Sequence, residues 1–425
     1  MSGLFLGIDV GTGGVRACAV DTRGDIRGME SAALPPPRQD GAAIDQDPEL
    51  WWQATVAAIG KLGARIDLAG VERISVDGTS GTLLLIAEDG RPLTPGLMYN
   101  DARAATDAAR IAAVAPAESG AHGASSALAK LLHLVRQGPG GARFAVHQAD
   151  WIAGRLAGQH GVSDENNTLK LGYDPVTRTW PAWLDRLDVP RELLPKVLVP
   201  GTSFATVDPK VAATLGLPSS AHVAAGTTDG VAAFIATRAD TPGDAVTSLG
   251  TTLVVKLLAT RPIFAASQGV YSHRLGDSWL AGGASNSGGG ALLAHFTAAE
   301  MERLTPQLRP EASTGLDYYP LAKPGERFPI ADPAMPARIT PRPPEDHRFF
   351  QALLEGIASV EALAYRQLAR LGAPPLRRVI SIGGGARNDA WTEIRRRALG
   401  VPVTVAEQTE ASYGAALLAL RGGPA

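Results

Sequence analysis

Short apolar runs separated by small polar turns dominate the start of the chain, and this pattern is typical of β-strands. We expect a β-meander over residues 4–33 that turns at 21–25. Two further strands are expected at 74–77 and 82–88, the second closed by a turn at Asp89-Gly90.

Apolar residues at helical spacing mark a second set of segments. The longest ends at Gly372 with prolines beyond it, which is a strong stop signal. Near the start of the chain, Asp47 precedes Pro48 as a candidate cap, because proline is favoured at the first helical position. The helices expected from these signals lie at residues 48–62, 101–115, 125–135, 150–156, 345–371, 388–399 and 410–421.

Beyond Gly226 the pattern becomes β-rich again. The stretch 315–344 is dense in proline and predicts an extended segment that follows the surface. Residues 160–210 show no clear periodicity. The β elements expected in this half are a hairpin over 269–283 around Gly276-Asp277 and strands at 379–382 and 401–405.

Each half of the chain thus opens with a strand, a glycine-bearing turn and a second strand, and continues into alternating α and β elements. A duplicated α/β fold with a cleft between its halves is the economical interpretation. We place the boundary at Ala225-Gly226, which predicts domains over 1–225 and 226–425. A chain of 425 residues is long enough for two such domains.

The composition indicates a globular protein without a strong electrostatic partner. Hydrophobic residues make up 45% of the chain and charged residues 19%, which excludes a disordered chain. Forty basic residues against 42 acidic ones give a net charge of −2. We therefore expect no nucleic acid and no membrane among its partners.

The cysteine usage bears on the compartment. The single cysteine, Cys18, lies in an expected buried strand, so a disulfide framework is excluded and a reducing, cytoplasmic compartment is expected. The first apolar run is interrupted by Gly7 and Asp9 and does not resemble a signal peptide, and no stretch is apolar enough to cross a bilayer. No transit peptide is visible; for a plant protein, a plastid stroma-like compartment is the alternative. The eight histidines lack zinc-binding spacing.

Two short glycine-threonine loops carry the first candidate chemistry. One is Asp9-Val10-Gly11-Thr12-Gly13-Gly14 and the other is Ser248-Leu249-Gly250-Thr251-Thr252, each between two β-rich runs. A turn without bulky side chains lets backbone N–H groups and a threonine hydroxyl approach an anion closely. Two such turns predict a polyphosphate held from two sides, and therefore a nucleotide site.

Two aspartates stand where such a site needs carboxylates. Asp9 ends the first strand and can hold magnesium against the phosphates, although a turn aspartate that satisfies its own backbone is the alternative. Asp229 follows a small-residue strand and opens an apolar helix. It is either a first-turn acid stabilised by the helix dipole or the base that takes a proton from an attacking hydroxyl, and the spacing favours neither.

Two further glycine loops follow buried strands. Gly383-Gly384-Gly385 precedes Asn388 and offers flat backbone to an adenine or ribose, a signal that is weak alone. Asp77-Gly78-Thr79-Ser80-Gly81 offers a carboxylate and hydroxyls suited to a polyol, with a plain turn as the alternative. Ser126 and Lys130 share a helix face that partly lines the expected cleft.

In combination these motifs resemble the FGGY carbohydrate kinases of the actin/hexokinase/Hsp70-like superfamily. The resemblance covers nearly the whole chain and keeps the motif order DVGTGG, VDGTSG, GTTDGVAAF, SLGTT, GERFPIADP, LLEGIASVE and GGGARN. Within the family, the stretches GLDYYPLAKPGERFPIADP and GGASNSGG are similar to the compact D-ribulose kinases of cyanobacteria and plants, which are xylulose-kinase-like.

This resemblance implies two RNase H-like domains with ATP, Mg2+ and a sugar in the cleft. It implies that Asp229 is the catalytic base, that it contacts the sugar, and that Asp9 is associated with magnesium. Asp77 and Ser80 fall where family members contact the sugar. The residues that match nucleotide contacts are Gly11, Thr12, Gly13, Gly250, Thr251, Gly384, Gly385 and Asn388.

Departures from better-known family members narrow the range of expected sugar acceptors. Thr79-Ser80-Gly81 stands where glycerol kinases carry an Arg-Glu pair, which argues against glycerol, and the Met-His-Gly of many xylulokinases is absent. The expected acceptor is the ketopentose D-ribulose, with D-xylulose, L-ribulose or a polyol as alternatives. A nucleotide-driven scaffold of the same superfamily is disfavoured, because no appended domain follows Arg421. We expect a monomer or homodimer.

Overall fold

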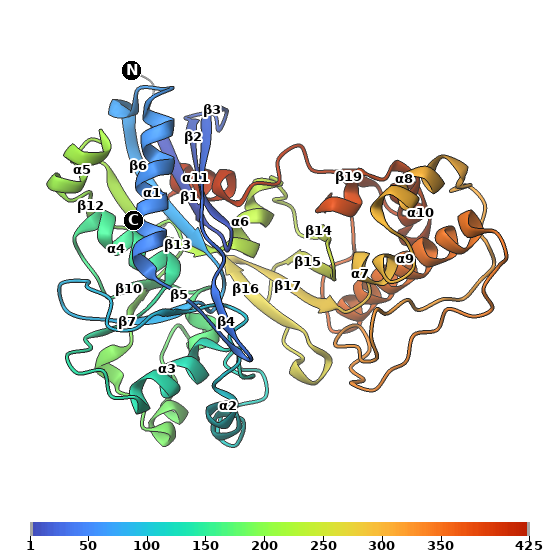
Figure 1. The fold of residues 1–425 in the computed structure, drawn as a ribbon, viewed down its shortest axis with the longest axis horizontal. Helices are drawn as coiled ribbons and strands as arrows, with labels where there is room; N and C mark the ends of the chain where they lie inside the picture. The colour runs from blue at the N-terminus through green and yellow to red at the C-terminus, as the bar shows by residue number, and fades with distance from the viewer. Residues whose placement is uncertain (1–2, 423–425) are drawn as a thin grey trace. The chain divides into compact units, whose positions relative to one another are not determined.

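The computed structural model describes residues 3–422 and divides into two compact units (Figure 1). Unit 1 comprises the chain up to Ala236, the short stretch His273–Gly276 and the residues from Glu410 onward. Unit 2 comprises Thr237–Ser272 and Asp277–Thr409. The predicted division at Ala225-Gly226 therefore falls inside a strand of unit 1, and the last helix of the chain returns to unit 1.

The main sheet of unit 1 has the strand order β12-β13-β6-β1-β2-β3. The predicted meander is confirmed as the antiparallel strands β1 (Leu4–Val10), β2 (Gly14–Asp21) and β3 (Ile26–Ala33). Strand β6 (Val71–Gly78) runs parallel to β1, and β13 (His222–Thr228) runs parallel to β6. The carboxyl ends of β1, β6 and β13 consequently lie at one edge of the sheet.

Helices cover both faces of this sheet, because alternate residues of a strand point to opposite sides. Helix α1 (Pro48–Gly63), capped by Asp47 as predicted, packs with Leu6 and Ile8 of β1. Helix α11 (Ala411–Arg421) lies on the other face, where a side chain at Gly7 would overlap the Ser412 backbone. This close approach explains why the end of the chain belongs to unit 1.

The remaining helices of unit 1 are α2 (Ala105–Ala112), α3 (Ala127–Arg136), α4 (Gln148–Ala157), α5 (Pro209–Leu215) and α6 (Asp229–Ala236). The prediction of a helix over 101–115 was wrong at its start. The Asp101 carboxylate accepts hydrogen bonds from the Ile44 N–H at 2.6 Å and from Arg103, which holds the residues before α2 as a loop.

A second sheet of unit 1 has the order β4-β5-β8-β7-β9. Its strands are β4 (Arg38–Asp40), β5 (Ala43–Gln46), β8 (Gly96–Leu97), β7 (Leu83–Ile86) and β9 (Phe144–His147). The unassigned region 160–210 holds short pieces only, the strands β10 (Val162–Asp164), β11 (Lys196–Leu198) and β12 (Ser203–Thr206) among single helical turns.

Unit 2 is built on a mixed sheet in which β14 (Asp244–Leu249) and β15 (Leu253–Ala259) form a hairpin. Strands β16 (Tyr271–Leu275) and β17 (Ser278–Ser285) are neighbours in the sheet order, as the predicted hairpin around Gly276-Asp277 requires. On the other side of β14 lie β18 (Arg378–Ile382) and β19 (Val403–Val405).

The helices of unit 2 are α7 (Gly289–Leu293), α8 (Ala298–Leu304), α9 (Asp346–Arg370) and α10 (Asp389–Leu399). Helix α9 confirms the longest predicted helix, and its apolar face forms much of the core of this unit. The proline-dense stretch 315–344 has neither helix nor extended strand pairing, as expected. It is nevertheless anchored, because Tyr318, Tyr319 and Phe328 are buried.

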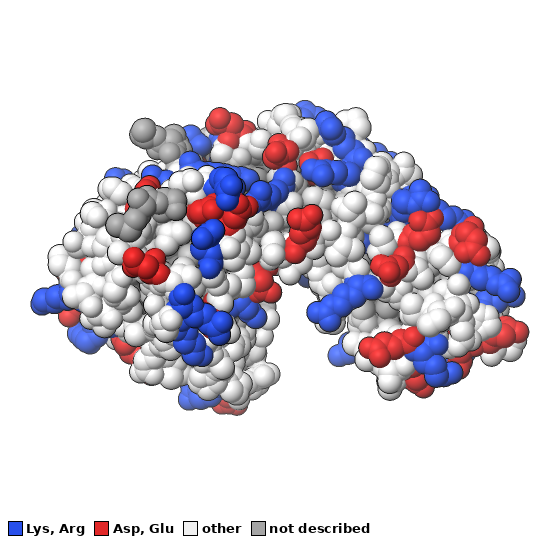
Figure 2. Space-filling model, turned by 90° about the horizontal axis from the view of Figure 1, so that it is seen from above, with Lys and Arg blue, Asp and Glu red and all other residues white. Residues whose placement is uncertain are grey.

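The surface carries no field of a single sign on the face shown in Figure 2, where basic and acidic side chains alternate. Within residues 3–422, no helix has the combined length and apolar character that crossing a membrane requires.

Candidate active site

Three aspartates meet at the carboxyl-end edge of the main sheet of unit 1. Asp9 in β1 is the register partner of Asp77 in β6, and Asp77 is in turn the partner of Thr227 in β13. Asp229 comes directly after β13 and is the first residue of α6. The structure therefore brings together three residues that the sequence singled out separately, because parallel strands end at the same edge.

Burial and mutual repulsion shift the pKa values of Asp9 and Asp77 upward. Burial raises the pKa of Asp9 to about 6, the neighbouring Asp77 carboxyl lowers it, and the charge of Asp229 raises it further. The pKa of Asp77 is raised well above its usual range by complete burial and then by the charges of Asp9 and Asp229. Neither carboxyl oxygen of Asp77 has a hydrogen-bond partner among residues 3–422, and its complete burial favours the neutral form of this carboxyl.

One guanidinium faces this cluster. Arg16 of β2 donates to the Asp9 carboxylate at 3.2 Å and pairs with Glu410 at 3.0 Å. In the described residues no set of three or more His, Cys, Asp or Glu side chains forms a ready metal site. Mg2+ commonly takes one or two carboxylates and completes its shell with phosphate oxygens and water. The Asp9 carboxyl, which keeps a small exposed fraction, fits one position of that donor set.

Asp229 is half-buried, and its Oδ1 accepts a hydrogen bond from the Gly230 N–H at 2.6 Å. This bond joins adjacent residues, whereas an N-cap side chain accepts from an N–H two or three residues further on, so it is not itself a capping bond. The charge of Asp229 also acts on the pKa values of Asp9 and Asp77. The carboxylate thus starts a helix and faces the acidic cluster as well, so the two interpretations are compatible.

The loop Gly78–Gly81 after β6 is held by side chains that sequence reasoning did not identify. Gln148 accepts hydrogen bonds from the N–H and the hydroxyl of Thr79 at 3.1 and 2.8 Å. Lys170 donates to the Ser80 carbonyl at 3.1 Å. Burial lowers the pKa of Lys170, and the charge of Asp229 offsets only part of this shift. The Ser80 hydroxyl has no partner in the described part of the protein.

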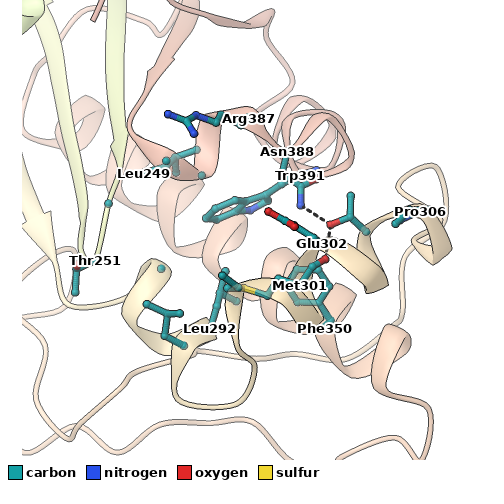
Figure 3. A pocket seen from close by; sticks show the side chains of 17 residues that line it. Leu249, Thr251, Leu292, Met301, Glu302, Pro306, Phe350, Arg387, Asn388 and Trp391 are labelled. Carbon is teal, nitrogen blue, oxygen red and sulfur yellow. Dashed lines mark hydrogen bonds between the residues drawn. The ribbon is translucent and has the colours of Figure 1, made fainter. Parts of the chain in front are cut away.

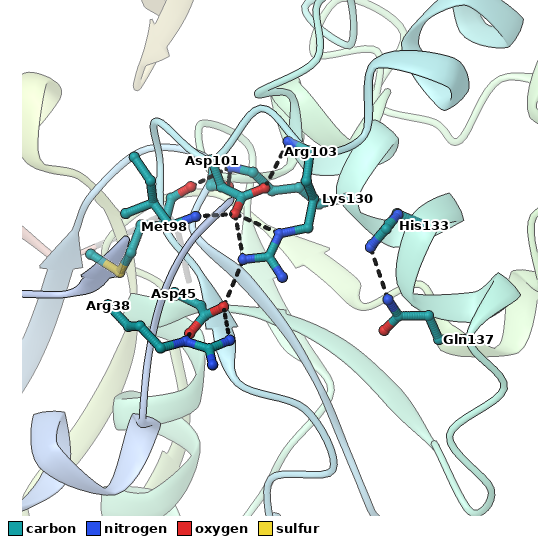
Figure 4. A network of polar contacts seen from close by, with 10 residues as sticks. Arg38, Asp45, Met98, Asp101, Arg103, Lys130, His133 and Gln137 are labelled. Carbon is teal, nitrogen blue, oxygen red and sulfur yellow. Dashed lines mark hydrogen bonds and ion pairs between the residues drawn. The ribbon is translucent and has the colours of Figure 1, made fainter. Parts of the chain in front are cut away.

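A second lysine donates a hydrogen bond to the last residue of the same loop. Lys130 is completely buried and donates to the Gly81 carbonyl at 2.8 Å and to the Met98 carbonyl at 2.7 Å (Figure 4). Burial lowers the pKa of Lys130 to about 7, against the attraction of Asp101. The expectation that Lys130 partly lines a cleft was wrong, since its ammonium group serves backbone carbonyls inside unit 1.

An ion-pair chain continues outward from this lysine. Arg103 bonds to Asp101 and to Asp45, each at 2.7 Å, and Arg38 pairs with Asp45 at 3.1 Å (Figure 4). The chain of ion pairs joins β5 to the loop before α2, and Lys130 donates to the Met98 carbonyl just before that loop. The second sheet of unit 1 is therefore tied to the residues that follow Met98.

The first glycine-threonine loop forms a tight turn between β1 and β2. Gly11 N–H donates to the Gly14 carbonyl at 3.0 Å, and the Gly13 carbonyl accepts from Leu34 N–H at 3.0 Å. The N–H groups of Thr12 and Gly13 have no protein acceptor among residues 3–422. Such unpaired donors at an exposed turn are what an anion requires.

The second loop, between β14 and β15, rests on the start of α7. Gly289 and Gly290 donate their N–H groups to the carbonyls of Gly250 and Thr251 at 2.8 and 2.9 Å. Side chains at these glycines would collide with the loop backbone, so the run of glycines lets the helix touch the loop directly.

The two segments with the closest family resemblance form one network beside this loop. The buried Glu326 carboxylate accepts hydrogen bonds from Ser285 Oγ at 2.5 Å, Asn286 N–H at 2.7 Å and Tyr319 Oη at 2.8 Å. Ser287 N–H donates to Ser285 Oγ, and the Ser287 carbonyl accepts from Leu253 in β15. Glu326 therefore fixes the turn that leads into α7.

Unit 2 contains a cavity of about 660 Å³ into which the predicted nucleotide residues open (Figure 3). Gly250, Thr251, Gly384, Gly385 and Asn388 all line it. The other lining residues are mostly apolar and come from α7, α8, α9 and α10: Leu292, Leu293, Met301, Phe350 and Trp391, with Glu302 and Arg387 as charged exceptions.

Asn388 and Trp391 define the wall next to the glycine loop. Asn388 caps α10, since its Oδ1 accepts from Trp391 N–H at 3.0 Å, and its Nδ2 donates to Thr305 Oγ1 at 3.1 Å. The Trp391 indole lies beside Asn388 and donates to the Leu354 carbonyl. Sequence reasoning missed Trp391, although its spacing from the glycine run and the cap was a usable signal. A flat indole wall suits a purine ring.

Comparison with known proteins agrees with this geometry. The model of the FGGY carbohydrate kinase N-terminal domain matches residues 4–236, and that of the C-terminal domain matches residues 245–422. The gluconokinase of Bacillus subtilis (strain 168) is 24% identical over 99% of this chain and 88% of its own length. The xylulose kinase of Escherichia coli (strain K12) is 25% identical over 92% and 84%.

Solved structures are similar over the full length. A xyloylose kinase from Brucella ovis superposes with a TM-score of 0.89 at 24% identity and covers 99% of this chain and 91% of its own. A xylulose kinase from Lactobacillus acidophilus gives 0.86 at 21% identity, covering 98% and 88%. These likenesses confirm the predicted α/β class with two actin/hexokinase-like domains.

The glycine loop of the cavity provides a matched pair of variants. In Gly385→Ala, the new methyl group would overlap the Trp391 ring and lie 2.9 Å from Leu249 Cβ, whereas in Gly384→Ala it would meet nothing within 4 Å. We expect Gly385→Ala to lower the free energy of unfolding by about 1–3 kcal/mol and Gly384→Ala to leave it nearly unchanged. Urea denaturation measures both, and equal midpoints would contradict the packing described.

Lys130 predicts a pH dependence of stability. Its pKa is about 7 in the folded chain and near 10.5 when unfolded, so between these values only the unfolded lysine binds the proton. The free energy of unfolding should therefore rise with pH across that window, by about 1.4 kcal/mol per unit from this group. Lys130→Met should remove that rise.

The matched control is Lys61→Met, which removes an exposed lysine that also donates to a backbone carbonyl. Denaturant titrations of all three proteins between pH 7 and pH 10 provide the measurement. A Lys130→Met protein with the wild-type pH dependence would show that the buried lysine stays charged.

Proposed function

We propose that this chain, which belongs to the FGGY family of carbohydrate kinases, transfers the γ-phosphoryl group of ATP to a terminal hydroxyl of a ketopentose. D-Ribulose is the proposed acceptor and D-ribulose 5-phosphate the product. The observation that carries the proposal is the meeting of Asp9, Asp77 and Asp229 at one sheet edge, next to a loop with an unpartnered serine hydroxyl.

Asp229 is proposed as the general base. Transfer of a phosphoryl group to a hydroxyl asks for a carboxylate that accepts the hydroxyl proton as the oxygen attacks in line. Asp229 starts α6, so its backbone is fixed by the helix and by the Gly230 contact. Positioning and charge neutralisation supply most of the rate in such reactions, which suits a site with little covalent chemistry.

Asp9 is proposed to bind Mg2+ together with the phosphates, with Asp77 as its neighbour on the adjacent strand. When bound, Mg2+ neutralises charge on the phosphate oxygens. Asp9 is 5% exposed and Asp77 is fully buried, so Asp9 is the carboxyl that can reach a ligand. Because burial favours the neutral form of Asp77, this neighbour adds little repulsion against a negative charge on Asp9.

ATP is proposed to place its adenosine in the cavity of unit 2. The cavity offers the Trp391 ring, the glycine run and an apolar lining, as a purine nucleoside requires. Thr251 at its margin belongs to the second phosphate loop, and Thr12 and Gly13 of the first loop carry unpaired N–H groups for phosphate oxygens.

The acceptor assignment rests on the loop Gly78–Gly81. Ser80 is proposed to bond a sugar hydroxyl, since its own hydroxyl lacks a partner and its backbone is fixed by Lys170. The similarity to D-ribulose kinases in GGASNSGG and GLDYYPLAKPGERFPIADP supports D-ribulose. D-Xylulose is the alternative, which the xylulose kinases among the relatives favour.

A panel of acceptors tests the assignment. ADP formation is coupled to a detection enzyme with D-ribulose, D-xylulose, L-ribulose, gluconate and glycerol, and the phosphorylated product is identified. We expect kcat/KM to be highest for D-ribulose, by about tenfold or more over its epimer. A higher kcat/KM for D-xylulose would replace the proposed acceptor, and no sugar-stimulated ADP release would overturn the function.

Two asparagine variants test the roles of the acids. Asp229→Asn removes the proposed base and should lower kcat by about 10²- to 10⁴-fold with little change in nucleotide binding. Asp77→Asn replaces a protonated carboxyl by a neutral group of the same shape and should cost far less. Similar losses in both variants, or a near-normal rate in Asp229→Asn, would refute the assignment.

A further inference from the structure

The nucleotide cavity of unit 2 contains a charge that the proposed function has not used. Helix α8 turns one face toward the cavity, formed by Ala298, Met301, Glu302 and Thr305, which follow helical spacing. Glu302 is the charged residue on that face. Its neighbours Glu300 and Arg303 do not line the cavity, and Glu300 is engaged in the cap of α8 with Thr297.

Glu302 has no hydrogen bond or ion pair with any other residue in the described chain 3–422. Glu302 lines the cavity together with Asn388 and Trp391, and Figure 3 shows its side chain among the residues of that lining. A ligand that fills the cavity would remove water from this carboxylate. Glu302 is exposed in the free protein, so a ligand that covers it gains a charge-assisted hydrogen bond if it places a donor there and meets repulsion if it places an acceptor there.

The other polar groups on this side of the cavity are already occupied. Thr305 Oγ1 accepts from Asn388 Nδ2 at 3.1 Å and donates to the Met301 carbonyl at 2.8 Å. Asn388 Oδ1 accepts from Trp391 N–H. Glu302 is therefore the side-chain acceptor on this wall whose bonding capacity is unused.

We propose that Glu302 determines nucleoside selectivity by accepting a hydrogen bond from the nucleoside part of the bound nucleotide. This rests on the proposed use of the cavity for ATP. An adenine nucleoside carries two kinds of donor, the exocyclic amino group and the ribose hydroxyls, and a carboxylate accepts from either. A base that presents a carbonyl at the amino position, as hypoxanthine does, meets this carboxylate with an acceptor and is disfavoured.

The experiment uses the full chain and three variants, Glu302→Ala, Glu302→Gln and the control Glu311→Gln. Glu311 is an exposed glutamate outside the cavity. Calorimetric binding of ADP, IDP and 2′-deoxy-ADP, and kcat/KM for the matching triphosphates with sugar in excess, are compared. IDP lacks the amino group and 2′-deoxy-ADP lacks one ribose hydroxyl, so the two analogues distinguish the two donors.

We expect the wild-type protein to bind the adenine nucleotide about tenfold more tightly than one of the two analogues. Glu302→Ala should lose most of this preference, because its affinity for the adenine nucleotide falls. If the amino group is the donor, Glu302→Ala loses the preference for the adenine over the inosine nucleotide. Glu302→Gln then binds the inosine nucleotide better still, because its amide can donate to the carbonyl. If the ribose is the donor, the deoxy preference collapses instead. Glu311→Gln should behave as wild type.

Both preferences unchanged in Glu302→Ala would overturn the inference, while sugar phosphorylation by the same protein would leave the proposed function intact. The converse result is equally distinct. Glu302-dependent nucleotide binding without transfer to any sugar would support the selectivity role and refute the kinase assignment. A wild-type protein that binds none of the nucleotides would refute both.

Discussion

The proximity of three carboxyl groups at the end of one sheet constrains everything else in unit 1. Burial, together with repulsion among Asp9, Asp77 and Asp229 at adjacent strand ends, raises the pKa values of the first two, and Arg16 donates a hydrogen bond to Asp9. Repulsion among neighbouring carboxylates costs stability in the free protein, and a bound cation would relieve it. A cluster of this kind therefore points to a functional site. The surrounding polar contacts serve to hold it: Lys170 and Gln148 fix the neighbouring loop, and Lys130 supports that loop from inside.

Much of this site follows from the sequence, because strand ends and glycine turns are local signals. Asp9 and Asp229 stand directly after short apolar runs, and the shared edge of parallel strands then brings them together. The same logic singled out Gly250, Thr251 and the run ending at Asn388, which line one cavity of unit 2. These predictions needed only strand order, which the motif sequence supplied.

What the sequence could not supply are partners distant along the chain. The boundary at Ala225-Gly226 failed because β13 belongs to the first sheet, and nothing in the pattern of 410–421 indicates that this helix returns to β1. Helix α2 begins late because Asp101 bonds to Ile44, more than fifty residues away. The sequence pattern places Lys130 on a helix face that partly lines a cleft, yet its ammonium group is buried among carbonyls that two separate loops provide.

The segment between α8 and α9 shows how an irregular stretch takes part in a site. Its prolines prevent regular pairing, so its position depends on a few buried anchors and on one carboxylate. The Glu326 carboxylate accepts hydrogen bonds from Ser285 and Asn286, which form the turn before α7. The glycines at the start of α7 in turn bond to the second glycine-threonine loop. Two sequence stretches that resemble the same branch of the family are therefore one physical unit, because a change in either would leave buried hydrogen-bonding groups of the other without partners. The network couples the two stretches whatever sugar is bound.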